Sequence, residues 1–130
     1  LIFSPEERIG LVKEALKDNP KIKVMGYSGL TVDFARQIDA QVITRGLRVF
    51  SDFEFEFRMG LANQRLASDI ETVAFITAEQ HTFLSSSTVK EIASLQGDVS
   101  SMVPPYVERA LKAKVHGLGD SHSPPNALRD

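Results

Sequence analysis

The sequence predicts an α/β fold in which a parallel sheet is flanked by helices. Apolar runs at residues 22–27, 42–44 and 71–76 are typical of strands, and helical patterns with apolar residues at three- and four-residue spacing follow them. Strands that alternate with helices pair in parallel through helical crossovers. A length of 130 residues suits one domain, which we expect over residues 1–116, with a mobile Gly-, Ser- and Pro-rich tail at 117–130.

Composition excludes several functional classes. Charged residues make up 25% of the chain and the net charge is -2, without the basic excess of a general nucleic-acid binder. No apolar run approaches the roughly 20 residues of a membrane span, and the start lacks the basic-then-apolar order of a signal peptide. Zero cysteines exclude disulfides and thiolate metal sites, and His81 has no second His or Cys placed to complete a metal site. We expect a cytoplasmic protein without nucleic-acid or membrane partners.

The first helix is predicted from its start and stop signals. Ser4 is expected as N-cap, Pro5 as the first helical residue and Glu7 as the capping-box partner, and Asn19-Pro20 stops the pattern. A complete parallel α/β domain usually has a strand before such a helix. We therefore expect a further segment upstream of Leu1.

The next elements predict a strand-helix-strand unit. Residues 22–27 form a short apolar run, Ser28-Gly29 breaks it, and a helical pattern over 32–38 leads to the run at 42–44. Because loops that follow parallel strands lie at one edge of the sheet, residues 28–31 and 45–48 should share that edge.

Residues 42–63 are the centre of the predicted site. The apolar run ends at Arg45 and Arg48, which places two cations where open α/β sheets bind ligands, an arrangement suited to phosphates. The helix that follows has two apolar stripes, which are Phe50, Phe53, Phe57 and Leu61, and Phe55, Met59, Ala62 and Leu66. One stripe is expected to cover the sheet, and the other to contact a ligand or another subunit. Asp52 and Glu56 share a face, and either a helix-dipole role or a functional role fits them.

Later elements supply the second half of the predicted site. After the strand at 71–76, a loop leads to Ser85, Ser86 and Ser87, where a helix begins. Their hydroxyls and the free N–H groups of the helix start can receive a phosphate, while N-capping explains only one of the three serines. Gly97 should end this helix, and a last helix is expected over 107–115 with Gly117 as its end.

Two segments carry a family resemblance, VITRGLRVFSDFEFEFRMGLANQRLASDIETVAFI and HTFLSSSTVKEIASLQGDVSSMVPP. From residue 3 to about residue 114 the chain resembles phosphopantetheine adenylyltransferase, most specifically in RGLR with DFE-x-E and in SSS-x-V-K-E with its downstream GDV. The resemblance implies a Rossmann-like nucleotidyltransferase fold, a homohexamer, and transfer of the adenylyl group of ATP to 4'-phosphopantetheine in coenzyme A synthesis, giving dephospho-coenzyme A and pyrophosphate. It also implies binding of coenzyme A, and Mg²⁺ held mainly by ATP phosphates and water.

The resemblance implies roles for individual residues. The catalytic residues it implies are Arg48 and Ser86. Those expected to bind ATP are Gly46, Leu47, Arg48, Glu56, His81, Thr82, Phe83, Leu84, Ser85, Ser86 and Ser87. Those expected to bind phosphopantetheine are Leu30, Thr31, Arg45, Phe55, Met59, Asn63 and Glu91. The chain departs from the family pattern at His81, where the family has Tyr or Trp, and at Thr31, where it has a larger apolar residue.

One part of the family pattern is not in these 130 residues. Family members begin with a strand and the motif G-S-F-D-P-x-T-x-G-H, whose histidine stabilises the transition state, so we expect this chain to be the C-terminal three quarters of the enzyme and to be inactive alone. Two alternatives stay open. One is a related nucleotidyltransferase with another acceptor, and the other is a catalytically silent module that binds nucleotide or coenzyme A.

Overall fold

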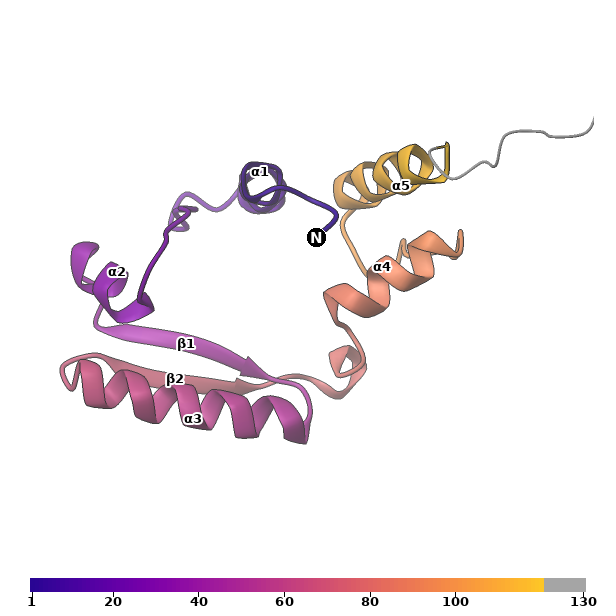
Figure 1. Ribbon diagram of the computed structural model, residues 1–130. Helices are drawn as coiled ribbons and strands as arrows, with labels where there is room; N and C mark the ends of the chain where they lie inside the picture. Colours follow the sequence, from indigo (N-terminus) through magenta and orange to yellow (C-terminus); the bar gives the residue numbers. More distant parts are fainter. Residues whose placement is uncertain (121–130) are drawn as a thin grey trace, which may run out of the picture. The chain divides into compact units, whose positions relative to one another are not determined.

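The computed structural model describes residues 1–120 (Figure 1). These residues form two compact units, one over Tyr27–Phe83 and one made of Leu1–Gly26 with the described residues from Leu84 onward. The expectation of one domain over 1–116 stays a prediction.

The unit over Tyr27–Phe83 contains a parallel two-stranded sheet, as the sequence predicts. Strand β1 (Val42–Leu47) pairs in parallel with β2 (Glu71–Ile76), and Val42 lies opposite Glu71 at one end and Leu47 opposite Ile76 at the other. The helix α3 (Phe50–Leu66) connects the strands and packs along both. A shorter helix, α2 (Thr31–Gln37), precedes β1. The predicted α/β class, with a parallel sheet flanked by helices, is therefore confirmed.

A small core closes the end of this unit opposite the arginines. Its fully buried side chains are Val32, Ala35, Ala67 and Ile70, and Ala40 and Ile43 pack against them. These residues come from α2, from the start of β1 and from the turn between α3 and β2. The core therefore holds the two strands together at their amino-terminal ends. The carboxyl ends of the strands, which carry the arginines, lie at the opposite end of the sheet.

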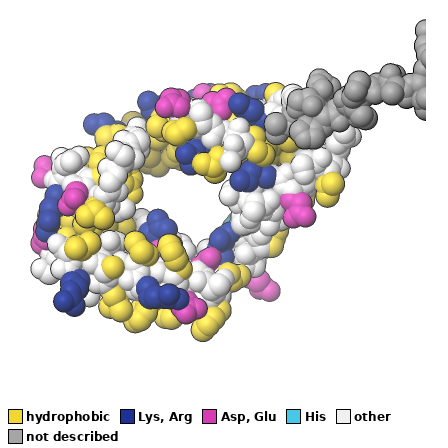
Figure 2. Space-filling view, in the orientation of Figure 1, with side chains coloured by type: hydrophobic (Ala, Val, Ile, Leu, Met, Phe, Trp, Pro, Cys, Tyr) yellow, Lys and Arg dark blue, Asp and Glu magenta, His cyan; other side chains and the backbone are white. Residues whose placement is uncertain are grey.

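The expectation that an apolar stripe of α3 covers the sheet holds only in part, because Phe53, Phe57 and Leu61 face β2 across a pocket but remain about half exposed. The least exposed residues of α3 are Asp52, Glu56, Gly60 and Asn63, which recur at helical spacing on one face. A Cβ atom on Gly60 would lie 3.8 Å from Thr72 Cγ2, so the helix approaches β2 at this glycine. Both predicted apolar stripes flank that polar face and are largely exposed in the described residues. Figure 2 shows hydrophobic side chains on the surface in the region of α3.

The predicted strand over residues 22–27 is also not observed. This segment has no regular secondary structure and joins no sheet, since the described residues contain only the β1-β2 ladder. A strand needs a neighbour to satisfy its backbone N–H and C=O groups, and periodicity alone does not reveal whether one is available. The strand β1 does pair with β2, but its residues Val42 and Thr44 are exposed.

The other unit is helical. Helix α1 (Pro5–Leu16) begins as predicted, with Ser4 Oγ accepting from the Glu7 N–H at 3.1 Å and Glu7 Oε2 accepting from the Ser4 N–H at 2.8 Å. Helix α4 (Ser86–Ser94) and helix α5 (Pro105–Asp120) contact each other, and α5 also contacts α1. The buried core of the unit consists of Val89, Ala93, Val99 and Leu111.

Helix α5 continues past its predicted end at residue 115. It runs through Gly117 to Asp120, so residues 117–120 belong to a helix and not to the predicted tail. A glycine inside a helix costs only about 1 kcal/mol relative to alanine, so on its own it does not stop one. Residues 121–130 of the predicted tail lie outside the described residues. No helix among the residues described is long and apolar enough to cross a membrane.

Candidate functional site

Two arginines stand at the carboxyl end of β1. Arg45 lies inside the strand, opposite Ala74 of β2, and Arg48 follows directly after the last strand residue, Leu47. The sequence places Arg45 just beyond a shorter strand, and the structure extends that strand through Gly46 and Leu47. The prediction of two cations at this edge is confirmed.

Glu56 of α3 holds Arg45 by a two-point ion pair. Arg45 Nε donates to Glu56 Oε2 at 2.8 Å, and Arg45 Nη2 donates to Glu56 Oε1 at 2.6 Å. The Glu56 side chain is 14% exposed and that of Arg45 is 49% exposed. Hydrogen bonding from Arg45 lowers the pKa of Glu56 below its ordinary value of 4.5. Both carboxylate oxygens of Glu56 are thus already bound to an arginine.

Asp52 of α3 holds Arg48 in a similar way. Arg48 Nε donates to Asp52 Oδ2 at 2.9 Å and Nη2 donates to Oδ1 at 3.3 Å, while the backbone N–H of Arg48 donates to Oδ2 at 3.2 Å. Hydrogen bonding from Arg48 lowers the pKa of Asp52 below its ordinary value of 3.8. The sequence left either a helix-dipole role or a functional role open for Asp52 and assigned it no ligand, and its spacing of four residues from Arg48 is the signal for this ion pair.

One pocket collects most of the residues expected to bind phosphopantetheine. Its volume is about 180 Å³. The predicted residues that line it are Thr31, Arg45, Phe55, Met59 and Asn63. Thr31 and Arg45, from the two segments predicted to share a sheet edge, line this pocket together, although no strand precedes Thr31. Leu30 does not line this pocket, and Glu91 is an exposed residue of α4 in the other unit.

Tyr27 contacts Thr31, which lines this pocket. Its hydroxyl lies 2.7 Å from Thr31 Oγ1, and its ring stacks on Phe34 with centroids 4.5 Å apart. Thr31 and Phe34 both belong to α2, so these contacts tie the chain before α2 to that helix. Tyr27 was not a predicted site residue, and its spacing of four residues from Thr31 is the only sequence signal for this contact.

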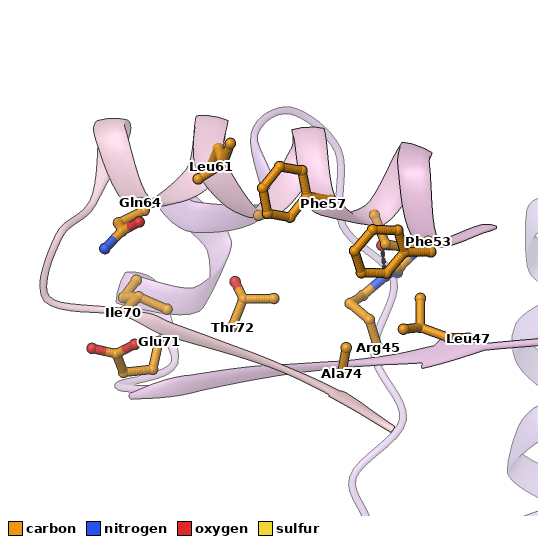
Figure 3. A pocket seen from close by; sticks show the side chains of 12 residues that line it. Arg45, Leu47, Phe53, Phe57, Leu61, Gln64, Ile70, Glu71, Thr72 and Ala74 are labelled. Carbon is orange, nitrogen blue, oxygen red and sulfur yellow. Dashed lines mark hydrogen bonds and ion pairs between the residues drawn. The ribbon is translucent and has the colours of Figure 1, made fainter. Parts of the chain in front are cut away.

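A second pocket lies on the other side of the Arg45–Glu56 pair, with a volume of about 220 Å³ (Figure 3). Phe53, Phe57 and Leu61 of α3 form one wall, and Thr72 and Ala74 of β2 face them. Arg45, Glu56, Gly60 and Thr72 line both pockets. The Arg45–Glu56 ion pair and the close contact between α3 and β2 therefore lie between the two pockets. The pockets differ in their lining, since Thr31 and Asn63 line only the smaller one.

The three serines stand at the start of α4, as predicted. Ser85 is the N-cap and its Oγ accepts from the Thr88 N–H at 3.1 Å. Ser85 Oγ also lies 3.0 Å from Ser87 Oγ and 2.9 Å from Thr88 Oγ1. Ser86 is the first residue of the helix and is exposed. The helix start thus presents hydroxyl groups beside backbone N–H groups that have no partner within the helix.

The segment before α4 contains the remaining residues expected to bind ATP. His81 is exposed and ends a short 3-10 helix, η1 (Glu79–His81), and Thr82 Oγ1 donates to the Glu79 carbonyl at 2.8 Å. Phe83 is exposed, and Leu84 packs against the core of the helical unit. Within residues 1–120, no group of three or more His, Asp or Glu side chains could hold a metal ion.

Comparison with known proteins identifies the family. Residues 1–92 match the family model described as cytidylyltransferase-like. The chain is 50% identical over 115 residues to the phosphopantetheine adenylyltransferase of Desulfitobacterium hafniense (strain DSM 10664 / DCB-2), an alignment that covers 88% of this chain and 71% of the relative. It is 52% identical over 110 residues to that of Moorella thermoacetica, covering 85% and 69%. For Roseiflexus sp. (strain RS-1) the identity is 53% over 112 residues, covering 86% and 70%.

The chain belongs to the phosphopantetheine adenylyltransferase family. This confirms the resemblance stated from RGLR and from the serine-rich helix start, and it confirms the nucleotidyltransferase class of the fold. The family model spans both Arg45–Arg48 and Ser85–Ser87. The individual roles of these residues in phosphopantetheine adenylyltransferase chemistry stay predictions.

Proposed function

We propose that this chain forms the acceptor- and ATP-binding part of an enzyme that transfers the adenylyl group of ATP to 4'-phosphopantetheine. The products are dephospho-coenzyme A and pyrophosphate, in coenzyme A synthesis. The observation that carries the proposal is the pair of carboxylate-held arginines, Arg45 and Arg48, at the carboxyl end of β1 in a chain of this family. Parallel α/β sheets bind their ligands at this edge.

The reaction requires two anions to be held together. A phosphate oxygen of 4'-phosphopantetheine attacks the α-phosphorus of ATP, the new P–O bond forms as the bond to the bridging oxygen breaks, and the electron pair leaves with pyrophosphate. Fixed cations stabilise the charge that moves onto pyrophosphate and hold the reactants in line. In this proposal Arg45 binds the acceptor phosphate, and Arg48 binds the phosphates of ATP.

The pocket that contains Thr31, Phe55, Met59 and Asn63 supports the proposed acceptor site. Its apolar side chains suit the aliphatic arm of pantetheine, and Arg45 at its border suits the terminal phosphate. Leu30 and Glu91 complete the proposed acceptor set, although neither lines this pocket.

The start of α4 supports the proposed ATP site. Backbone N–H groups at a helix N-terminus and the hydroxyl of Ser86 suit a phosphate, because the helix dipole favours negative charge there. We assign Ser86 a catalytic role together with Arg48. The remaining residues proposed to contact ATP are Gly46, Leu47, Glu56, His81, Thr82, Phe83, Leu84, Ser85 and Ser87.

Mg²⁺ fits this site only as an ion held by the substrate. No side-chain cluster in residues 1–120 offers a metal cage, and Asp52 and Glu56 are each engaged by an arginine. Phosphate oxygens and water are ligands that Mg²⁺ prefers. A bound Mg²⁺ would shield the charge of the triphosphate.

The proposed reaction also implies the small-molecule partners and the location of the protein. ATP, 4'-phosphopantetheine, dephospho-coenzyme A and coenzyme A are the proposed small-molecule partners, and the cytoplasm, where ATP is plentiful, is the proposed location. We also propose a homohexamer. The exposed apolar stripes of α3, which include Phe57 and Met59, support self-association.

Arg48→Ala in the full-length protein tests the proposed function. Because the variant removes a fixed cation from the transferring phosphates, we expect adenylyl transfer to fall by roughly 10²-fold or more, measured as pyrophosphate release with ATP and 4'-phosphopantetheine. Arg58→Ala is the matched control, since Arg58 lies on an exposed part of α3 and pairs with Glu54. Near-normal turnover of Arg48→Ala would contradict the proposal. Release of pyrophosphate with only a different acceptor would identify a related nucleotidyltransferase instead.

A further inference from the structure

The carboxylate of Asp52 contacts two different groups of Arg48, its guanidinium and its backbone N–H. Its carboxylate accepts from the guanidinium at Nε and Nη2, at 2.9 and 3.3 Å, and it also accepts from the backbone N–H of the same residue at 3.2 Å. The side-on contact holds one edge of the planar guanidinium and therefore fixes its plane as well as its position. One carboxylate thus anchors both the backbone and the side chain of Arg48.

The placement of Asp52 parallels that of Glu56. The two carboxylates are four residues apart on α3, and the two arginines that they hold are three residues apart at the end of β1. The Asp52 side chain is 23% exposed, whereas Phe53, beside it on the helix, is 49% exposed. The first two turns of α3 thus bring two arginine-binding carboxylates toward the end of β1, at positions where an apolar contact would be the ordinary arrangement.

We propose that Asp52 is a positioning residue that orients Arg48 toward the phosphates of ATP. This inference rests on the proposed function. A free arginine side chain samples many rotamers, and a cation that is already oriented stabilises transferring phosphates without reorganising during the reaction. The carboxylate itself does not touch the substrate, because a phosphate beside it would be repelled.

A purely structural role for Asp52 makes a different prediction. The N-cap of α3 is Val49, which offers no side-chain acceptor, so Asp52 in the first turn also serves the helix start. If that were its only role, its replacement would lower the melting temperature and leave the turnover of the folded enzyme unchanged. A positioning role instead lowers kcat in protein that is fully folded.

The test is Asp52→Asn in the full-length protein. The amide oxygen of Asn still accepts from the backbone N–H of residue 48, but its NH₂ group faces the guanidinium as a second donor. We expect kcat for pyrophosphate release to fall roughly 10- to 100-fold because Arg48 is misplaced, while the melting temperature stays close to that of the wild type. Glu54→Gln is the control, since Glu54 holds Arg58 on the same helix away from the site, and its kcat should stay within about twofold of the wild type.

A double-mutant cycle decides whether Asp52 acts through Arg48. In the Arg48→Ala background, Asp52→Asn should cause no further loss of kcat, because its partner is already absent. An equal loss in both backgrounds, or a normal kcat for Asp52→Asn alone, would overturn the inference. If Asp52→Asn does not fold, Asp52→Ser provides the same comparison with a shorter acceptor.

ATP affinity, measured by calorimetry on the same variants, separates this inference from the proposed function. A wild-type protein that binds ATP but transfers no adenylyl group to 4'-phosphopantetheine would count against the proposed function. Weaker ATP binding by Asp52→Asn would even then support the role of Asp52, and unchanged ATP binding would then overturn it.

Discussion

At the scale of single residues, the site is defined by how its two arginines are held. Arg45 and Arg48 each contact a carboxylate of α3 at two points, so both guanidinium groups have a fixed orientation before any substrate is present. In the first pair Arg45 is 49% exposed and Glu56 14%, and in the second Arg48 is 36% exposed and Asp52 23%. Because solvent screening weakens exposed ion pairs, each pair should contribute only modestly to stability.

The Arg45–Glu56 pair makes stability depend on pH in a defined direction. Arg45 lowers the pKa of Glu56, so the unfolded chain binds a proton at Glu56 more readily than the folded protein does. The stabilisation is therefore fully present above the ordinary pKa of 4.5 and is lost as the pH falls through the lower pKa of the folded state.

Glu56→Gln should reduce the free energy of unfolding at pH 7 by about 0.5–1 kcal/mol, because Arg45 is half exposed and the pair is partly screened. Denaturant unfolding of both proteins at pH 7 and near pH 4 measures the difference, which should shrink at the lower pH. Glu14→Gln is the control, since its pair with Lys17 is exposed on α1. A difference that grows as the pH falls would contradict the assigned ion pair.

At the scale of elements, α3 determines the chemistry of the site. Its strand-facing side carries Asp52, Glu56, Gly60 and Asn63, so the helix brings carboxylates to the arginines and a glycine to β2. The apolar stripes on either side line two separate pockets. The helix α3 thereby supplies the carboxylates that bind the arginines and one wall of each pocket.

Two glycines of the helical unit should respond oppositely to alanine. At Gly97, just after α4, a Cβ atom would lie 2.6 Å from Ile92 Cγ2 and 3.1 Å from the Ile92 carbonyl oxygen, so Gly97→Ala should destabilise the fold by about 1–3 kcal/mol through overpacking. Gly10, inside α1, has no atom within 4 Å of the corresponding position, so Gly10→Ala should stabilise by up to about 1 kcal/mol. Chemical denaturation measures both changes, and equal effects at the two positions would contradict this account.

At the scale of the whole molecule, exposed apolar surface is the most unusual property of the described residues. Phe50, Phe55 and Phe57 are each more than half exposed, and Phe75 and Ile76 of β2 are exposed as well. Monomeric proteins rarely leave large contiguous groups of apolar side chains in water. The surface therefore favours contact with other parts of the assembled protein.

The full-length protein should sediment as a homo-oligomer, because association removes these side chains from water. Analytical ultracentrifugation over a range of concentrations measures this, and ATP and 4'-phosphopantetheine should be omitted so that only protein contacts contribute. A monomer at all concentrations would contradict the proposed assembly.

Local signals in the sequence predicted much of the fold. The capping box at Ser4 and Glu7 and the helix start at the serines depend on neighbours within a few residues, and both are present in the structure. The strand over 71–76 is also present, and its distant partner is β1. The strand at 22–27 was predicted wrongly because strand formation depends on a distant partner. The end of α5 was misplaced because a glycine is a weak signal without an accompanying cap.

The sequence by itself determined the residue types of the candidate site, the family, and the placement of Arg45 and Arg48 at the end of a parallel strand. These follow from short-range order along the chain and from motif spacing. Only the tertiary structure decided which side of α3 lies toward the strands, because both apolar stripes were equally suited to burial by periodicity. That orientation pairs Glu56 with Arg45 and Asp52 with Arg48, since an ion pair requires a distance that only the packing of helix on strand can set.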